Sequence, residues 1–135
     1  MRLVAPMLVQ IALTLVVLGL LGRARARAVG RKQVKISDVA LGNDAWPPHI
    51  QALGNNYANQ FETPVLFYVL CGLALYIGAT EWLMVALAWL FVASRIAHTI
   101  VHTGSNIVLT RFRIFIVGVA ALAAMLLILV VRLVA

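Results

Sequence analysis

The sequence predicts an all-α integral membrane protein, a four-helix bundle whose chain crosses the bilayer four times. Of its 135 residues 64% are hydrophobic, only 11% are charged, and the apolar residues gather in four long runs. A soluble domain of this length cannot bury that much apolar surface, whereas a bilayer removes the need to bury it. Because lipid offers no hydrogen-bond partners to open backbone groups, we expect all four runs to be helical.

The expected spans cover residues 3–21, 55–79, 82–102 and 112–134, each close to the roughly 20 residues that a helix needs to cross a bilayer. Only the loop 22–54 has room for further structure, so we expect a single membrane domain.

Pro47 and Pro48 argue against a regular helix late in this loop. The short link from Gly78 to Glu81 predicts a tight antiparallel hairpin of the second and third spans. Gly118 in the fourth span is typical of close helix packing.

The net charge of +7 follows a membrane topology pattern. Six of the eleven basic residues directly follow the first span, and two flank the start of the fourth (Arg23, Arg25, Arg27, Arg31, Lys32 and Lys35; Arg111 and Arg113). The positive-inside rule places the loops after the first and third spans in the cytoplasm and both termini on the other side. This distribution explains the charge without a nucleic-acid partner. Because the basic cluster follows the first apolar run, we expect a retained span rather than a cleaved signal peptide.

Two stripes of polar residues interrupt the apolar spans. Each stripe has the spacing of one helix face (Asn55, Asn59 and Glu62 in the second span; Arg95, His98 and His102 in the third). In an antiparallel hairpin the two stripes come to equal depths, with Glu62 opposite Arg95 and the others following in order, Asn59 opposite His98 and Asn55 opposite His102. The same pairs can also form across a subunit boundary.

Ionisable side chains inside a membrane are costly, so they usually face the protein interior and mark functional sites. We therefore expect Glu62 and Arg95 to form a pair or to share a ligand. The structural alternative is a buried pair, with amides that hold the helices together. Because the stripes open toward the basic loop, they favour a cavity for a polar ligand.

A metal site and a reactive thiol are both disfavoured by the sequence. His98 and His102 are spaced i, i+4, and Glu62 offers a third ligand, but the chain has no His-Glu-x-x-His motif and Arg95 would repel a cation. We therefore expect no metal. Cys71 is the only cysteine and lies within a span, where a small packing residue is the expected role.

The stretch NNYANQFETPVLFY, residues 55–68, resembles the MAPEG family of membrane-associated proteins in eicosanoid and glutathione metabolism. The stretches LAWLFVASRIAHTIVH, residues 87–102, and RFRIF, residues 111–115, also fit. The pattern covers most of the chain and resembles the bacterial branch of the family. It implies a homotrimer of four-helix protomers in a bacterial inner membrane, with glutathione bound between neighbouring subunits near the cytoplasmic face.

The resemblance also implies the residues of a glutathione site. Asn59 and Glu62 match the family motif Arg-x-x-x-Asn-x-x-Glu, and Asn55 stands where the family has its arginine. Tyrosines help to line the site late in the third span of some members, and two histidines occupy those positions here. A family arginine at the end of the first span is matched by Arg23, Arg25 or Arg27, of which we select Arg25. The expected glutathione ligands are Asn55, Asn59, Glu62, Arg95, His98 and Arg25.

The implied chemistry is activation of a thiol. A nearby cation or hydrogen-bond donor lowers the pKa of a thiol, and the thiolate then attacks an electrophile or reduces a peroxide. The candidate catalytic residues are Arg111, Arg113 and His102, and membrane anchoring is the alternative role of the two arginines. The predicted function is a glutathione-dependent transferase or peroxidase for lipophilic electrophiles, with glutathione as co-substrate.

A non-catalytic protein is the alternative to this enzyme, because Asn55 and the two histidines depart from the pattern of catalytic members. Such a protein would keep the fold and bind a glutathione-like anion, or it would serve as a structural membrane subunit whose polar stripes only hold helices together.

Overall fold

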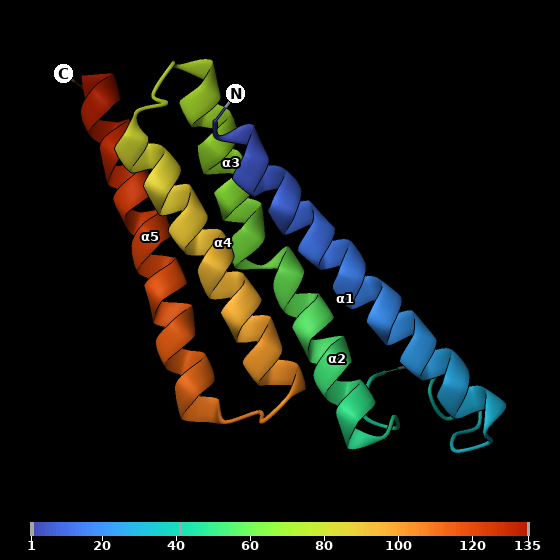
Figure 1. The fold of residues 1–135 in the computed structure, drawn as a ribbon. Helices are drawn as coiled ribbons and strands as arrows, with labels where there is room; N and C mark the ends of the chain where they lie inside the picture. The colour runs from blue at the N-terminus through green and yellow to red at the C-terminus, as the bar shows by residue number, and fades with distance from the viewer. Residues whose placement is uncertain (1, 41, 135) are drawn as a thin grey trace.

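The structure is a computed structural model that describes residues 2–40 and 42–134. Its elements are α1 (Val4–Gly30), α2 (Pro48–Ala58), the 3-10 turn η1 (Asn59–Phe61), α3 (Thr63–Tyr76), α4 (Trp82–Thr103) and α5 (Val108–Val134). Because α2, η1 and α3 follow one another as one broken leg, the bundle has four legs (Figure 1). The predicted all-α membrane bundle is confirmed.

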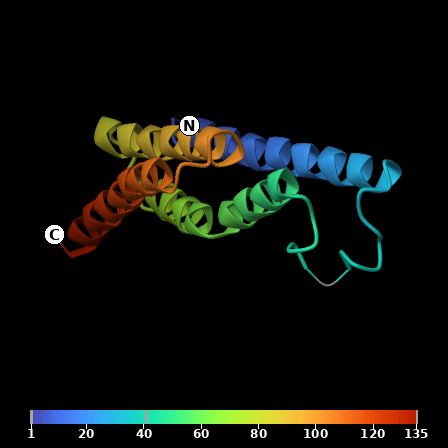
Figure 2. The ribbon, with the colours of Figure 1, turned by 90° about the horizontal axis from the view of Figure 1, so that it is seen from below.

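The two ends of the bundle carry different connections. α1 begins and α5 ends at one end, beside the turn from α3 to α4 (Figure 1). The loop after α1 and the link from α4 to α5 lie at the opposite end. α1 and α4 form one side of the bundle, and α5 and the broken leg form the other (Figure 2). The central position belongs to α4, which contacts α1, α2, α3 and α5.

The main core lies where α3, α4 and α5 meet. Phe67 of α3 stacks on Phe91 of α4, with their ring centroids 4.7 Å apart. Met84 of α4 and Met125 of α5 are fully buried in the same cluster. Tight packing of this kind is a main source of helix association in a membrane, where lipid is as apolar as the side chains themselves.

Close packing of α4 on α5 depends on Gly118. A methyl group at this position would lie 2.6 Å from Oγ of Ser94 on the facing helix. The Ser94 hydroxyl is held by donating a hydrogen bond to the carbonyl of Phe91, 2.6 Å away. The prediction of close packing at Gly118 is therefore confirmed.

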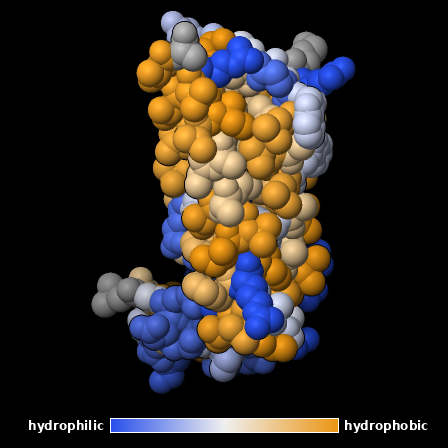
Figure 3. All heavy atoms as spheres, turned by 90° about the vertical axis from the view of Figure 1, so that its left-hand side faces the viewer, coloured by the Kyte–Doolittle hydropathy of each residue, from blue (hydrophilic) through white to orange (hydrophobic). Residues whose placement is uncertain are grey.

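Three helices, α1, α4 and α5, are long and apolar enough to cross a membrane. The face of the bundle beside α5 shows a broad hydrophobic band with hydrophilic groups toward both ends (Figure 3). The broken leg is different, because α3 has only 14 residues and rises about 21 Å, short of the ~30 Å hydrocarbon core. We infer that α2 and η1, which precede α3 in the same leg, supply the remainder of the second crossing.

The helix boundaries around the first loop correct the prediction. α1 continues beyond the predicted span 3–21 to Gly30, because the basic residues and alanines that follow are good helix formers; the bounds of the span itself stay a prediction. α2 begins at Pro48, inside the segment that the prolines predict to be non-helical. Proline is well suited to the first helical position, where its missing N–H has no helical partner to lose. Between α1 and α2 the described residues, 31–40 and 42–47, form no helix.

The second predicted span is not one continuous helix. The leg breaks at Glu62, whose φ of −96° and ψ of −101° lie outside the helical region. Pro64 follows in the first turn of α3 and has no N–H to donate to the carbonyl of Gln60, so a continuous helix would lose a hydrogen bond here. The residues before the break tighten into η1, and the two halves of the leg differ in direction (Figure 1).

The turn from α3 to α4 is as short as predicted. Gly78 has φ +74°, a left-handed conformation that glycine adopts without strain. The N–H of Ala79 donates to the carbonyl of Ala74 at 2.8 Å, which ends α3 in a typical C-terminal motif. An ion pair between Glu81 and Arg132 joins this turn to the end of α5.

Candidate functional site

A cluster of neutral polar side chains is buried where the leg breaks. Gln10 of α1 donates from Nε2 to Oε1 of Gln60 in η1 at 3.0 Å. Gln60 Nε2 lies 3.4 Å from Oγ1 of Thr99 in α4, and Thr99 donates to Oδ1 of Asn56 in α2 at 3.3 Å. All four side chains are buried. The cluster therefore ties three legs together at the break, as expected for polar groups in a membrane interior.

The sequence pattern of ionisable residues does not predict this cluster, because all of its side chains are neutral. The signal was present, because Asn56 and Gln60 are themselves spaced i, i+4. Their burial turns the neighbouring face outward, so that Asn55 and Glu62 are exposed and Asn59 is half-buried. Consecutive helical residues point about 100° apart, so only one of the two faces can meet α4.

Arg95 contacts the predicted stripe through the backbone. It is only 2% exposed, and its Nη2 donates to the main-chain carbonyl of Asn59 at 3.0 Å. No ion pair joins Glu62 to Arg95 in residues 2–40 and 42–134. A direct pair within one chain is therefore corrected, whereas a shared ligand or a pair across a subunit boundary stays a prediction. The physical reason is the break, which presents a carbonyl to the guanidinium and leaves the Glu62 carboxylate exposed.

The two other expected pairs are also not formed within this chain, as far as the described residues show. His98 and His102 are buried on α4, but their rings contact each other edge to face, with centroids 5.5 Å apart. Asn55 is hydrogen-bonded instead to Asn43 in the first loop, at 3.0 Å. The side chains of the two stripes therefore do not contact each other in the predicted pairs.

Four buried nitrogen atoms near the end of α4 and the start of α5 have no hydrogen-bond partner among the described residues. They are Nδ1 of His98, Nδ1 of His102, Nε of Arg95 and Nε of Arg111. Buried polar groups in proteins are nearly always paired, and guanidinium nitrogens can only donate. The group therefore suits a ligand that carries hydrogen-bond acceptors.

A hollow of about 190 Å³ opens at two of these four residues, His98 and Arg111. It is lined from both helices, by His98, Val108, Arg111, Phe112 and Phe115. Arg111 is half-buried, and its Nη1 donates to Oδ1 of Asn106 at 2.5 Å. Arg113 is exposed and does not line the hollow. Of the two arginines predicted from the sequence, only Arg111 therefore lies at the hollow.

Arg25, the arginine selected from α1, lies on the α1–α2 side of the bundle. Its guanidinium sits over the ring of Trp46, 5.1 Å from the centroid, and its Nη2 donates to Oδ1 of Asn43 at 3.3 Å. Asn43 also bonds to Asn55, so the structure links two predicted ligand residues through one loop side chain.

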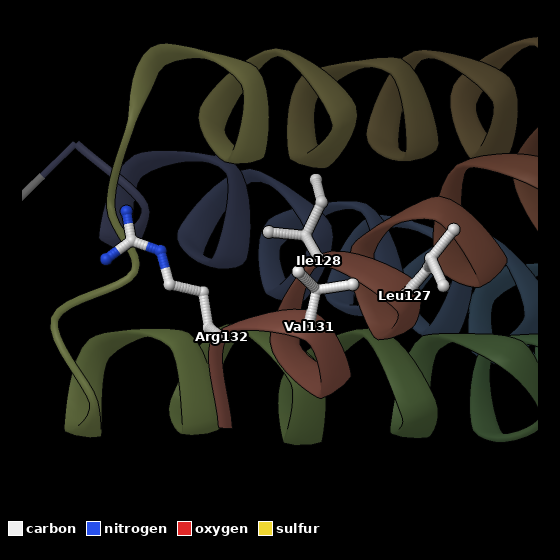
Figure 4. A pocket seen from close by; sticks show the side chains of 4 residues that line it. All are labelled: Leu127, Ile128, Val131 and Arg132. Carbon is white, nitrogen blue, oxygen red and sulfur yellow. The ribbon is translucent and has the colours of Figure 1, made fainter. Parts of the chain in front are cut away.

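The free thiol and one further hollow lie apart from this site. No group of three His, Cys, Asp or Glu side chains is placed to hold a metal in the part of the chain that the structure describes. Cys71 is a free thiol buried in the core. A hollow of about 560 Å³ lies at the opposite end of the bundle (Figure 4), lined by Leu127, Ile128, Val131 and Arg132. It is mostly apolar, and Glu81 neutralises its one charge.

Comparison with known proteins identifies a family. The model of the MAPEG family matches residues 3–131, nearly the whole chain. The matched region contains the broken leg, both buried histidines and the arginines at the start of α5. No curated protein and no solved structure matches.

Proposed function

The chain belongs to the MAPEG family, and from this premise we propose that it is a membrane-embedded, glutathione-dependent transferase or peroxidase acting on lipophilic electrophiles. Family membership and the three long apolar helices make it an integral membrane protein. The proposal concerns the ligand, the chemistry and the assembly.

The observation that carries the proposal is the group of unpartnered buried nitrogen atoms on Arg95, His98, His102 and Arg111. Glutathione carries two carboxylates, which accept strong hydrogen bonds from guanidinium groups. The ammonium group of glutathione favours a carboxylate partner. Glu62 can supply it, because Glu62 lies three residues after Asn59, whose carbonyl accepts the hydrogen bond from Arg95. Gln10 Oε1 and Asn56 Nδ2 of the helix-tying cluster also have no partner among the described residues. The nitrogen group differs from that cluster because two of its residues, His98 and Arg111, line a hollow, which favours a ligand over a purely structural role.

In a transferase reaction, the glutathione thiol first loses its proton to solvent or a nearby base. The thiolate sulfur then forms a bond to an electrophilic carbon, and the leaving group departs with the electron pair of the broken bond. In a peroxidase reaction, two glutathione molecules reduce one hydroperoxide to an alcohol and water and become a disulfide. We assign thiolate stabilisation first to Arg111 and second to His102, because a fixed cation or hydrogen-bond donor lowers the thiol pKa.

We propose that the site is completed in a homotrimer. The exposed residues Asn55 and Glu62 belong to the broken leg, and a neighbouring subunit that covered this leg would enclose them with the ligand. The lipophilic co-substrate would then enter from the bilayer. The basic loop is assigned to the cytoplasmic side of a bacterial inner membrane, with both termini on the other side.

The test is the melting temperature of the detergent-purified protein across a glutathione series, with S-hexylglutathione and oxidised glutathione in parallel. We expect a saturable increase, because a ligand that binds only the folded state stabilises it. No shift up to roughly millimolar glutathione would contradict the proposal and favour a structural subunit.

Turnover distinguishes the enzyme from its alternative, a non-catalytic protein that binds a glutathione-like anion. Glutathione-dependent consumption of an electrophilic dye supports a transferase, and consumption of a lipid hydroperoxide supports a peroxidase. Saturable binding without either reaction supports the non-catalytic binder.

A further inference from the structure

One side chain of the first loop, Asn43, joins α1 to α2 beside the candidate ligand residues. Its Oδ1 accepts a hydrogen bond from Arg25 Nη2 at 3.3 Å. Its Nδ2 lies 3.0 Å from Oδ1 of Asn55 and 3.0 Å from the carbonyl oxygen of Gln51. A single amide thus contacts the end of α1 and two successive turns of α2.

The surroundings of Asn43 hold its amide in this place. Gln51 donates from Nε2 to the carbonyls of Asp44 and Trp46, both at 2.7 Å, which fixes the loop immediately after Asn43. A methyl group at Gly54 would lie 2.5 Å from Asn43 Oδ1. The amide therefore fits against α2 only because position 54 has no side chain.

The orientation of these amides follows from the chemistry of their partners. A guanidinium can only donate and a main-chain carbonyl can only accept, so Arg25 and Gln51 together fix which end of the Asn43 amide is oxygen. The NH₂ group of Asn43 then donates to Asn55, whose side-chain oxygen must accept this hydrogen bond. The NH₂ group of Asn55 is left as the end that can bind another partner. Arg25 and Asn55 are bonded to the same Asn43 amide, so the two residues together offer donors suited to a carboxylate.

We infer that Asn43 is a positioning residue for the candidate site, which orients Asn55 as a donor toward a carboxylate group of the ligand and anchors the loop 31–47 on α2. The identity of the ligand rests on the proposed function, whereas the anchoring of the loop does not. Through Asn43, this loop contributes to the candidate site, in addition to carrying the basic residues that indicate the membrane topology.

Anchoring is measured by trypsin cleavage of the loop, which offers the exposed residues Arg31, Lys32 and Lys35. Asn43→Ala should raise the cleavage rate roughly fivefold, the factor expected from the net loss of one hydrogen bond. Gly54→Ala should also raise it, although alanine favours a helix over glycine, because the new methyl displaces the Asn43 amide. Gln33→Ala, an exposed position in the same loop, is the matched control and should leave the rate unchanged. Unchanged cleavage in both test variants would overturn the anchoring.

Positioning is measured by the concentration of ligand that gives half of the maximal melting shift, for glutathione and for its diethyl ester. Asn43→Ala and Gly54→Ala should weaken glutathione binding about tenfold relative to the ester, the factor for loss of one charge-assisted hydrogen bond. A general loosening of the fold would weaken both ligands equally and would overturn the positioning role. Absence of glutathione binding by the wild-type protein would overturn the proposed function and the positioning role together, while the cleavage result would still decide the anchoring.

Discussion

Arg95 of α4 donates a hydrogen bond from Nη2 to the main-chain carbonyl of Asn59 in η1, 3.0 Å away. The contact lies at the break of the second leg, where backbone groups cannot all find partners within one helix. A hydrogen bond with a charged donor is strong in such surroundings. The same arginine keeps Nε without a partner among the described residues, so it both supports the broken leg and offers a donor to a ligand.

The first prediction concerns this bond. Arg95→Met keeps an apolar side chain but removes the donors, and it should lower the free energy of unfolding by about 1–3 kcal/mol. Unfolding by a denaturing detergent measures the change. Arg113→Met, at an exposed position of α5, is the control and should change stability by no more than about 0.5 kcal/mol. Equal effects of the two substitutions would contradict the role of the Asn59 contact.

Glu62→Gln should separate ligand binding from stability. Because Glu62 is exposed and forms no ion pair in the described part of the chain, we expect a stability change within about 0.5 kcal/mol. If its carboxylate binds the ligand ammonium, glutathione affinity should fall roughly tenfold. Melting curves with and without glutathione measure both quantities. Lower stability without ligand would instead support a structural pair, and no change in either quantity would defeat both interpretations.

Arg111 and Arg113 should differ strongly in activity. Arg111 lines the hollow beside His98, whereas Arg113 is exposed. If Arg111 stabilises the thiolate, Arg111→Gln should reduce glutathione-dependent dye turnover about 100-fold, the scale seen when one stabilising donor is removed from an active site. Arg113→Gln, the matched control, should retain most of the wild-type rate. A larger loss in Arg113→Gln would reverse the assignment.

The bond between Gln10 and Gln60 should appear as an energetic coupling. Both side chains are buried and joined at 3.0 Å across two legs. A double-mutant cycle with Gln10→Leu and Gln60→Leu should give a coupling of about 0.6–1.7 kcal/mol, the range for hydrogen bonds between membrane helices. The cycle is measured by unfolding in a denaturing detergent, and strictly additive effects would count against the bond.

Gly118→Ala should destabilise the α4–α5 pair. The added methyl would lie 2.6 Å from Ser94 Oγ, and overpacking of this kind costs about 1–3 kcal/mol. Gly19→Ala is the control, because nothing lies within 4 Å of the added methyl there. Since the close atom is a hydroxyl oxygen, Ser94→Ala in the Gly118→Ala background should restore part of the loss. Failure of this rescue would show that backbone separation, and not the hydroxyl, sets the cost.

Several features were predictable because they depend on local properties of the chain. Apolar runs of membrane length gave the bundle, the link from Gly78 to Glu81 gave the hairpin, and Gly118 gave the close helix pair. The candidate site residues were also recognisable in the sequence, because ionisable residues are rare in such apolar runs. They are Arg95, His98, His102 and Arg111. These signals need no knowledge of neighbouring helices.

The partners of the polar residues were not predictable in the same way. Pro64 removes one helical hydrogen bond from the second leg, but its presence in the sequence does not tell how far the leg turns or which group compensates the lost bond. Residues one position apart on a helix point about 100° apart, so the turn at Glu62 decides whether Asn55 and Asn59 or Asn56 and Gln60 face α4. Asn43, far along an irregular loop, gave no periodic signal at all.

A helical membrane bundle follows from the amino-acid sequence, because lipid permits only helices for these apolar runs. The order of its polar groups in depth follows as well, because the helical rise sets their spacing. Tertiary structure alone decided which face of the broken leg is buried, that Arg95 meets a backbone carbonyl rather than Glu62, and that Asn43 reaches Asn55. Those outcomes depend on competition among several polar groups for the same partners, and only the packed arrangement of all four legs resolves that competition.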